Sequence, residues 1–461
     1  MDRVDIAILG GGIAGLAALF RVKKLSPHAR VVLFEAGPSA GGRLGSARIA
    51  GLTVDTAADA FLARVAGAVE LATELGLGDE LVAPATGQAA VVVHGELRAL
   101  PGGLVLGVPT DLDALAHSAI MSAEGLRIAA SDATTARPYS LPGDRSVADA
   151  IGSHLGSEVV DRLVDPLLGG ISAANSARLS IEAVSPLIAN AAREPHLMDA
   201  LVRAQAVAAQ GQIGVTEQRP VFLAPRSGVH QLVAALTVEV SEHIRLSTPV
   251  RSLTAEHDHW VIGTDSGPVA ATQIIAATPA YATARLLADQ PELAAKLRSI
   301  RYASVALIVM AYRRADAHLP PGSGVLVPRV EQRLVTAASW WDQKWPHLRH
   351  DDVVLIRASV GRIDDVRFQN MTDADLVAAG HQDLATMIGV RLDAPPVDNH
   401  VARWNDSFAQ YDVGHLGRVD EMMSILPAGL HLAGAPLRGV GLPACIRSAD
   451  AAALAATSAL A

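Results

Sequence analysis

The chain has 461 residues, of which 50% are hydrophobic and 18% are charged, with a formal net charge of −9 and a single cysteine, Cys445. This length and hydrophobic content suffice for two or three domains with a large core. The negative balance argues against a nucleic-acid partner, and one cysteine excludes an internal disulfide framework and suits a reducing compartment. We expect a cytoplasmic protein with at most peripheral membrane contact, because the N-terminal apolar run reads as a strand and not as a signal peptide, and runs such as ASVALIVMAY are too short to span a bilayer.

The N-terminal stretch VDIAILGGGIAGLAALFRVKKL carries a dinucleotide-binding fingerprint. An apolar strand passes through Gly10, Gly12 and Gly15 into a helix, and Glu35 ends the next strand. Gly10 permits the tight turn, Gly12 lets the backbone approach a pyrophosphate, and Gly15 lets helix and strand pack closely. Glu35 is predicted to accept hydrogen bonds from ribose hydroxyls.

A second glycine pair and an arginine follow in VVLFEAGPSAGGRL. An ordinary nicotinamide-binding site does not require this glycine pair or this arginine. A guanidinium at Arg43 can curl back to the pyrophosphate, and the adjacent glycines let the segment pass close to the ligand. Such a second phosphate contact favours a permanently held FAD over an exchangeable NAD, although a Gly-Gly turn followed by a solvated arginine remains the alternative.

The rest of the chain predicts a nucleotide-binding fold that is interrupted twice. Residues 66–210 alternate helical runs with one strand-like insert, AAVVVHGELRALP. Short strands follow, and the last of them, QIIAATP, returns the chain to the first sheet; YASVALIVMAYRR and DDVVLIRASVGR are apolar strands of a second sheet. We therefore predict an α/β protein with a Rossmann-like FAD-binding domain assembled from the discontinuous segments 1–65, 215–290 and 425–461, a mostly helical insertion over 66–210, and a mixed-sheet substrate domain over 291–424.

The C-terminal segment reads as a strand, a glycine-rich loop and a helix. A flavin that accepts hydride at N5 gains negative charge on its N1 and C2 oxygen side, and a helix N-terminus aimed there stabilises that charge. RGVGLPACI supplies such an end, with Pro443 in the first turn, where a missing N–H costs least. The alternative is an ordinary surface turn between strand and helix.

Taken together, these motifs resemble the FAD-dependent porphyrinogen oxidases of haem synthesis, a branch of the amine-oxidase-like flavoproteins. The resemblance covers the whole chain and rests on ILGGGIAGL, GGRL, LRALPGG, DPLLGGISAANSARLS, FLAPRSGVHQLVAAL, IRYASVALIVMAY, QYDVGHLGRV and LAGAPLRGVGLPACI. The first two are shared by many flavoproteins, and the others are more specific. The resemblance implies FAD contacts at Gly10, Gly11, Gly12, Ile13, Ala14, Gly15, Glu35, Ala36, Gly42, Arg43, Ala57, Ala58, Asp59, Ala60, Val250, Trp404, Val440, Gly441 and Leu442.

The chain departs from the family pattern at three places. Ala57-Ala58 stand where Gly-Pro is frequent, Asn175 stands where an aspartate is usual, and Ala409 replaces a frequent proline. None of these changes removes a recognised reacting group, but they put the contacts at the 57–58 turn and the turnover rate in doubt.

Acid–base machinery is inconspicuous in the sequence. There is no nucleophile elbow, HExxH or CxxC motif, and the HDH at 257–259 sits on a predicted hairpin tip, so we expect no metal and name no catalytic residue. This pattern fits hydride removal from an electron-rich substrate, in which the flavin supplies the chemistry. The resemblance implies three hydride transfers from a porphyrinogen to flavin N5, which remove six electrons, with oxygen as the final acceptor and a ferrochelatase as a candidate partner that takes the product.

The resemblance to the bacterial branch, carried by QYDVGHLGRV, favours coproporphyrinogen III over protoporphyrinogen IX. A flat apolar ring with carboxylates predicts a wide apolar pocket with arginines at its rim. Arg98 and Arg362 are the candidates, and alternation along VVLIRASVGR places Arg357 on the opposite face from Arg362. Each can instead be a solvated arginine, and His415 is either a proton acceptor or a structural histidine.

Two other function classes remain open. An amine oxidase would share the fold, but such relatives place a lysine in the strand SVALIVMAY, where this chain has Leu307, and their paired aromatic cage is not evident. A non-catalytic flavin-binding protein or haem chaperone is the second class.

Overall fold

The computed structural model describes residues 2–137, 143–210 and 220–460. A seven-stranded sheet forms the first lobe, in the order β12-β2-β1-β15-β14-β13, with β23 also paired to β15. Its strands are β1 (Asp2–Leu9), β2 (Val31–Phe34), β12 (Ile244–Arg245), β13 (Val250–Ala255), β14 (Trp260–Thr264), β15 (Gly267–Ala276) and β23 (Leu430–Leu432). The strands β12, β2, β1, β15 and β23 are parallel, so their carboxyl ends meet at one edge of the sheet.

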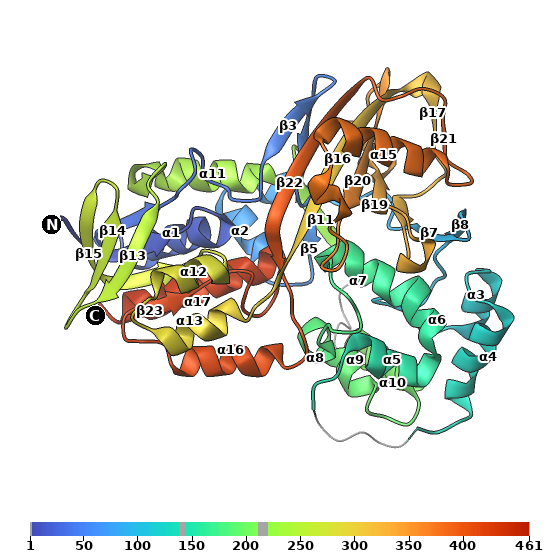
Figure 1. Cartoon of the computed structure of the whole chain (residues 1–461), viewed down its shortest axis with the longest axis horizontal. Coiled ribbons are helices and arrows are strands. Elements are labelled where there is room, and N and C mark those ends of the chain that lie inside the picture. The colour runs from blue at the N-terminus through green and yellow to red at the C-terminus, as the bar shows by residue number, and fades with distance from the viewer. Residues whose placement is uncertain (1, 138–142, 211–219, 461) are drawn as a thin grey trace.

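Helices cover both faces of this sheet (Figure 1). Successive side chains of a strand point to opposite faces, and accordingly Ile6 and Ile8 pack with one group of helices, whereas Ala7 and Leu9 pack with another. The first group is α1 (Ile13–Leu25), α2 (Ala68–Glu74), α11 (His230–Val240) and α17 (Leu442–Ser458); the second is α12 (Ala280–Leu286), α13 (Pro291–Arg298) and α16 (His415–Ser424). The continuous apolar runs of β1 and β2 are explained by this burial on both sides.

A second seven-stranded sheet has the order β22-β16-β20-β19-β18-β7-β8. Its strands are β7 (Ala90–Val93), β8 (Glu96–Ala99), β16 (Tyr302–Arg313), β18 (Gly324–Leu326), β19 (Val335–Trp340), β20 (Val353–Val360) and β22 (Asp398–Ala409), with α15 (Asp373–Ala385) and the short α14 (Trp341–Lys344) packed nearby. The hairpin β7–β8, which we predicted as a strand-like insert among helices, pairs with β18 and forms the edge of this sheet.

A helical lobe lies below the second sheet in Figure 1. It contains α3 (Leu112–His117), α4 (Ala123–Ala130), α5 (Val147–Leu155), α6 (Ser157–Val159), α7 (Asp165–Ser172), α8 (Ile181–Val184), α9 (Pro186–Ala191) and α10 (Leu197–Gln210). The small sheet β5-β11-β6 (Phe61–Leu62, Phe222–Pro225 and Leu81–Val82) and the ribbon of β3 (Ser46–Ile49) and β4 (Leu52–Asp55) connect the lobes. The division into three domains stays our proposal.

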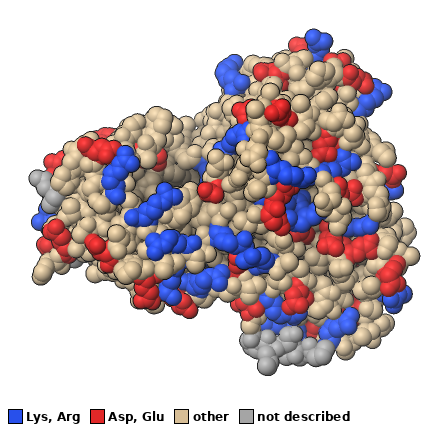
Figure 2. Space-filling model, in the orientation of Figure 1, with Lys and Arg blue, Asp and Glu red and all other residues tan. Residues whose placement is uncertain are grey.

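Basic and acidic side chains are interspersed over the face drawn in Figure 2, without a broad area of one sign. Within the described ranges, no helix is both long and apolar enough to cross a bilayer. Nor do these residues contain a group of three or more His, Cys, Asp or Glu side chains arranged to hold a metal ion.

Candidate functional site

The first glycine loop lies where β1 passes into α1, at the carboxyl edge of the first sheet. A Cβ at Gly15 would lie 1.8 Å from the carbonyl oxygen of Gly10, so helix and strand approach more closely than any side chain allows. The second glycine pair lies directly against this loop, because the Gly41 N–H donates to the Gly11 carbonyl at 2.8 Å and a Cβ at Gly42 would lie 3.0 Å from the Gly12 Cα. The two loops together form a backbone cradle that is open to a pyrophosphate.

Glu35 is positioned at the end of β2, as its spacing predicts. Its carboxylate accepts the N–H of Gly11 at 2.6 Å and the N–H of Gly37 at 2.7 Å. Each carboxylate oxygen keeps a further acceptor site, so a ribose diol can still bind there. The loop that leads to Val250, the first residue of β13, is tied to the same point, since the Thr248 N–H donates to the Glu35 carbonyl at 2.8 Å.

Arg43 is half-buried beside the cradle. Among the described residues its guanidinium has no hydrogen-bond or ion-pair partner, although Tyr281, Tyr302 and Cys445 lie near it. Burial lowers the pKa of Arg43, but an arginine remains protonated. An uncompensated cation next to two glycine loops fits a dinucleotide phosphate, which would supply the missing acceptor.

The segment 57–60 is fixed by charge from the second sheet. The carboxylate of Asp59, which is 8% exposed, pairs with Lys344 at 2.7 Å and with Arg357 at 3.0 Å. Burial alone would raise the pKa of Asp59, but the charges of Arg357 and Lys344 outweigh it and hold the pKa well below its usual range. Because this carboxylate is engaged, only the backbone of Asp59 and of the partly exposed Ala57, Ala58 and Ala60 can face a flavin.

The C-terminal loop ends at Gly441, which caps the N-terminus of α17, with Pro443 in the first turn and Val440 and Leu442 partly exposed on either side. Tyr411 fixes the loop, because its hydroxyl donates to the Ala435 carbonyl at 2.6 Å and accepts the Gly439 N–H at 2.7 Å. The loop therefore presents a helix N-terminus, as the sequence predicts.

His415 is a structural residue. Its ring stacks on Tyr411 with centroids 3.9 Å apart, its Nε2 donates to the Leu437 carbonyl at 2.7 Å, and it is 0% exposed. Burial lowers the pKa of His415 to about 4, so the ring is neutral at neutral pH. Of the two readings of this histidine, the structure favours the structural one.

Side chains of β16 and β22 form an apolar wall with Ala173 and Ile363. Trp404 packs with Ala173, Val305 and Ile363, and its indole N–H donates to the Thr56 carbonyl at 2.9 Å. Leu307 lies on the same strand face as Val305 and is partly exposed. The site thus brings Trp404 together with the segment that precedes Ala57.

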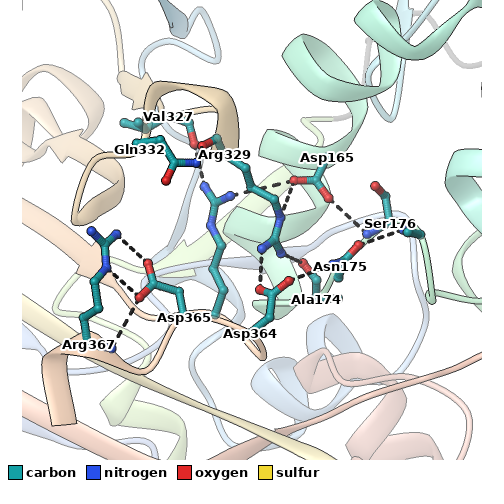
Figure 3. Close-up of polar contacts among 12 residues, drawn as sticks. Asp165, Ala174, Asn175, Ser176, Val327, Arg329, Gln332, Asp364, Asp365 and Arg367 are labelled. Carbon is teal, nitrogen blue, oxygen red and sulfur yellow. Dashed lines mark hydrogen bonds and ion pairs between the residues drawn. The ribbon is translucent and has the colours of Figure 1, made fainter.

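A polar network lies next to this wall in the chain, and its contacts are drawn in Figure 3. Arg329 lies between two carboxylates: it donates to Asp165 at 2.8 Å, pairs with Asp364, and also donates to the Ala174 carbonyl at 2.6 Å. Asn175 donates to Asp364 at 2.7 Å. Because Ala174 and Asp364 are chain neighbours of Ala173 and Ile363, this network positions two residues of the apolar wall.

The predicted substrate arginines are engaged by other groups of the protein. Arg362 is only 4% exposed and donates to the Val327 carbonyl at 2.5 Å, and burial lowers its pKa to about 10. Arg357 donates to the Ala57 carbonyl at 2.7 Å. Arg98 lies on β8, six strand steps from Trp404, which is roughly 29 Å at about 4.8 Å per step. Arg98 instead pairs with Glu96 in a separate cavity of about 400 Å³.

Sequence reasoning missed the residues that support the site. The network residues Asp165 and Arg329 are 164 positions apart, and Asp59 and Lys344 are 285 apart. Single charged residues at such distances carry no local motif. The one available signal was the DPLLGG stretch, which begins with a buried aspartate followed by a proline at the start of α7.

A family model, flavin-containing amine oxidoreductase, matches residues 13–456. The chain is 28% identical to the coproporphyrinogen III oxidase of Bacillus subtilis, over 97% of this chain and 96% of that one. It is 32% identical to the coproporphyrinogen III oxidase of Mycobacterium tuberculosis, over 96% and 95%, and 29% identical to the protoporphyrinogen oxidase of Bos taurus, over 96% of each.

Solved structures share the architecture. A crystal structure from Exiguobacterium sp. 255-15, described as a protoporphyrinogen oxidase, superposes with a TM-score of 0.86 at 30% identity over 98% of both chains. The cyclohexylamine oxidase of Brevibacterium oxydans superposes with a TM-score of 0.69 at 17% identity over 99% of both chains, which is a likeness of fold alone.

Proposed function

Because the chain belongs to the family of flavin-containing amine oxidoreductases, we propose that this FAD-dependent oxidoreductase oxidises coproporphyrinogen III to coproporphyrin III with oxygen as acceptor. The resemblance read from the motifs is confirmed at the level of the family. The observation that supports the substrate is the similarity, over nearly the whole chain, to relatives named coproporphyrinogen III oxidase. We further propose a cytoplasmic location and delivery of the product to a ferrochelatase.

The protein's own residues hold the cofactor and orient it. FAD, when bound, supplies the two-electron acceptor. The glycine loops and Arg43 would hold its pyrophosphate, and Glu35 its ribose. Gly441 at the start of α17 would present N–H groups and the positive end of the helix dipole to the side of the ring that gains charge.

The substrate wall is suited to a flat apolar macrocycle. Trp404, Val305, Ile363 and Leu307 offer no titratable group to the cleft. Orientation and exclusion of water are therefore the contributions that these residues make to the rate. His415 is not placed to take the proton, because its ring is 0% exposed and stacked on Tyr411, which leaves its Nδ1 out of reach of a substrate.

The overall reaction balances as one porphyrinogen and three oxygen molecules giving one porphyrin and three hydrogen peroxide molecules. Six electrons and six protons leave the macrocycle, two of each with every oxygen reduced. No further reductant or oxidant is needed.

The test is to supply each reduced porphyrinogen to the FAD-loaded protein in air and to follow porphyrin fluorescence. We expect acceleration over an enzyme-free control, a larger kcat/KM for coproporphyrinogen III, and no sustained turnover without oxygen. No acceleration with either porphyrinogen, together with peroxide formation from benzylamine, would identify an amine oxidase. Porphyrin binding without acceleration would identify a carrier.

Protoporphyrinogen IX is the second candidate substrate, because the Bos taurus and Exiguobacterium relatives carry that name. The two porphyrinogens differ in their carboxylates, four against two. Arg98 and Arg362, which have partners within the protein, do not decide between the two substrates. The kinetic comparison therefore decides, and a larger kcat/KM for protoporphyrinogen IX would reverse our choice.

A further inference from the structure

A second cavity lies away from the cofactor cradle, between β4, the start of α11 and the segment around α14. It has a volume of about 490 Å³, which falls within the range of small-molecule sites. Its lining is mixed: Leu52, Val54, Leu348 and Leu355 form the apolar part, in which Val54 and Leu355 are buried, and polar residues line the rest. An apolar body of aromatic or short aliphatic type therefore fits the apolar part.

Trp341 lines this cavity, and its buried indole N–H has no partner among the described residues. The residue is 2% exposed. A buried donor without a partner is unfavourable, so an acceptor atom brought by a ligand would be stabilised there.

The rim of the cavity carries a cation, Arg226, in a loose ion pair. Arg226 is exposed and lies 3.9 Å from Glu80, a distance too long for a hydrogen bond, so its guanidinium keeps its donors. The exposed Ser227 lies beside it. No aspartate or glutamate is among the residues that line the cavity in the described part of the chain.

Several other donors nearby are already engaged. Asp55 accepts the N–H groups of Val229 and His230 at 2.8 and 3.0 Å and pairs with the His230 ring at 2.7 Å, so the N-terminus of α11 is capped. His347 donates its Nε2–H to the Arg226 carbonyl at 2.9 Å. Arg226, Ser227 and Trp341 thus keep donors without an acceptor in the described part of the chain, as do the exposed Thr53 and one N–H of Gln231.

We propose that this cavity is a binding site for a small organic anion: a monocarboxylate with an apolar body and a neutral hydrogen-bond acceptor. The carboxylate binds Arg226 at the rim, the apolar body contacts Leu52 and Leu355, and the neutral acceptor binds the Trp341 indole. The site is separate from the oxidation proposed above, because none of its lining residues belongs to the cofactor cradle or to the apolar wall.

The probe is 4-acetylbenzoate, titrated into the FAD-loaded protein by isothermal calorimetry. We expect one saturable site per chain, with a dissociation constant about fivefold larger or more in Arg226→Gln, since a charge-assisted contact is lost. Trp341→Phe should weaken binding in the same direction. Arg349→Gln removes an exposed arginine that does not line the cavity, and it should bind as the wild type does.

A neutral analogue, 4-acetylbenzamide, should bind about fivefold more weakly or worse than the acid. The proposal is overturned if the wild type shows no saturable binding, if the amide binds as well as the acid, or if Arg226→Gln weakens binding by less than about fivefold, which would place the probe elsewhere, for example in the porphyrinogen cleft. Arg226 is exposed, so its replacement tests the site even if Trp341→Phe does not fold.

Discussion

Replacing Arg43 with alanine tests the cofactor site with little expected effect on the fold. The guanidinium makes no hydrogen bond or ion pair to any described residue, so its removal breaks no contact within the protein. The melting temperature of the FAD-free protein should therefore change little. What changes is the affinity for FAD, because a pyrophosphate oxygen loses a cationic donor.

The magnitude follows from the type of contact. A hydrogen bond to a charged group contributes about 1.5–3 kcal/mol, which corresponds to a dissociation constant roughly 10- to 150-fold larger. Since Arg43 is only half-buried, the lower end is the better expectation. Arg43→Lys keeps a charge but loses the planar fork, and it should lie between the wild type and Arg43→Ala.

The assay is a titration of the FAD-free protein with FAD, followed by quenching of flavin fluorescence. Arg48→Ala is the matched control, because Arg48 is exposed on β3, five residues away, and donates only to the Gly51 carbonyl. If Arg43→Ala and Arg48→Ala have the same FAD dissociation constant, the phosphate contact is refuted. The second glycine pair would then be a turn without a role in cofactor binding.

Four further changes probe the loop, the network and the buried charges. Gly15→Ala places a methyl group 1.8 Å from a carbonyl oxygen of its own loop, so the purified protein should lose FAD, and a full complement of flavin absorbance would contradict the packing. Asn175→Asp replaces a 2.7 Å hydrogen bond to Asp364 with two neighbouring carboxylates. The melting temperature should fall more at pH 7 than at pH 4, where one carboxyl is protonated, and equal falls at the two pH values would contradict the repulsion. Asp59→Asn leaves two basic side chains without a counter-charge, a cost of about 3–5 kcal/mol. Since the pKa of Asp59 is depressed, the stability that its charge provides is present above pH 4 and is lost as the pH falls below that value. The melting temperature of the variant should therefore fall less steeply below pH 4 than that of the wild type. His415→Gln removes a ring whose pKa is about 4 in the folded protein, against about 6.5 unfolded. The free energy of unfolding of the wild type should therefore fall by about 2 kcal/mol more between pH 7 and pH 5 than that of the variant. If the two free energies change in parallel with pH, the ring titrates normally.

The parts of the site that the sequence predicts are those set by the backbone over a short stretch. Gly10, Gly15 and Glu35 belong to one strand–helix–strand unit, and Arg43 follows it by a short loop, so local spacing predicts their neighbourhood. The structure adds the reason for the second glycine pair, since Gly42 packs on the first loop.

The positions of the predicted substrate arginines could not be derived from the sequence, for a physical reason. Whether Arg98 faces the cleft depends on which strand pairs with β7–β8, and that hairpin joins the far edge of the second sheet. Arg362 lies two residues beyond the end of β20, where strand alternation no longer decides its direction, and a buried carbonyl at Val327 holds it. Long-range pairing, not local pattern, decides both positions.

The same long-range contacts join the cofactor and substrate sides of the cleft. Arg357 on β20 holds the Ala57 carbonyl, Trp404 on β22 holds the Thr56 carbonyl, and Asp398 at the start of β22 accepts the Ala50 N–H at 2.6 Å. The segment that we propose to face the flavin is thus fixed from the sheet that carries the apolar wall. A change in the second sheet that shifts β20 or β22 should therefore also move this backbone segment, so variants designed for substrate preference are expected to alter the flavin absorbance spectrum, whereas exposed substitutions on β8 are not.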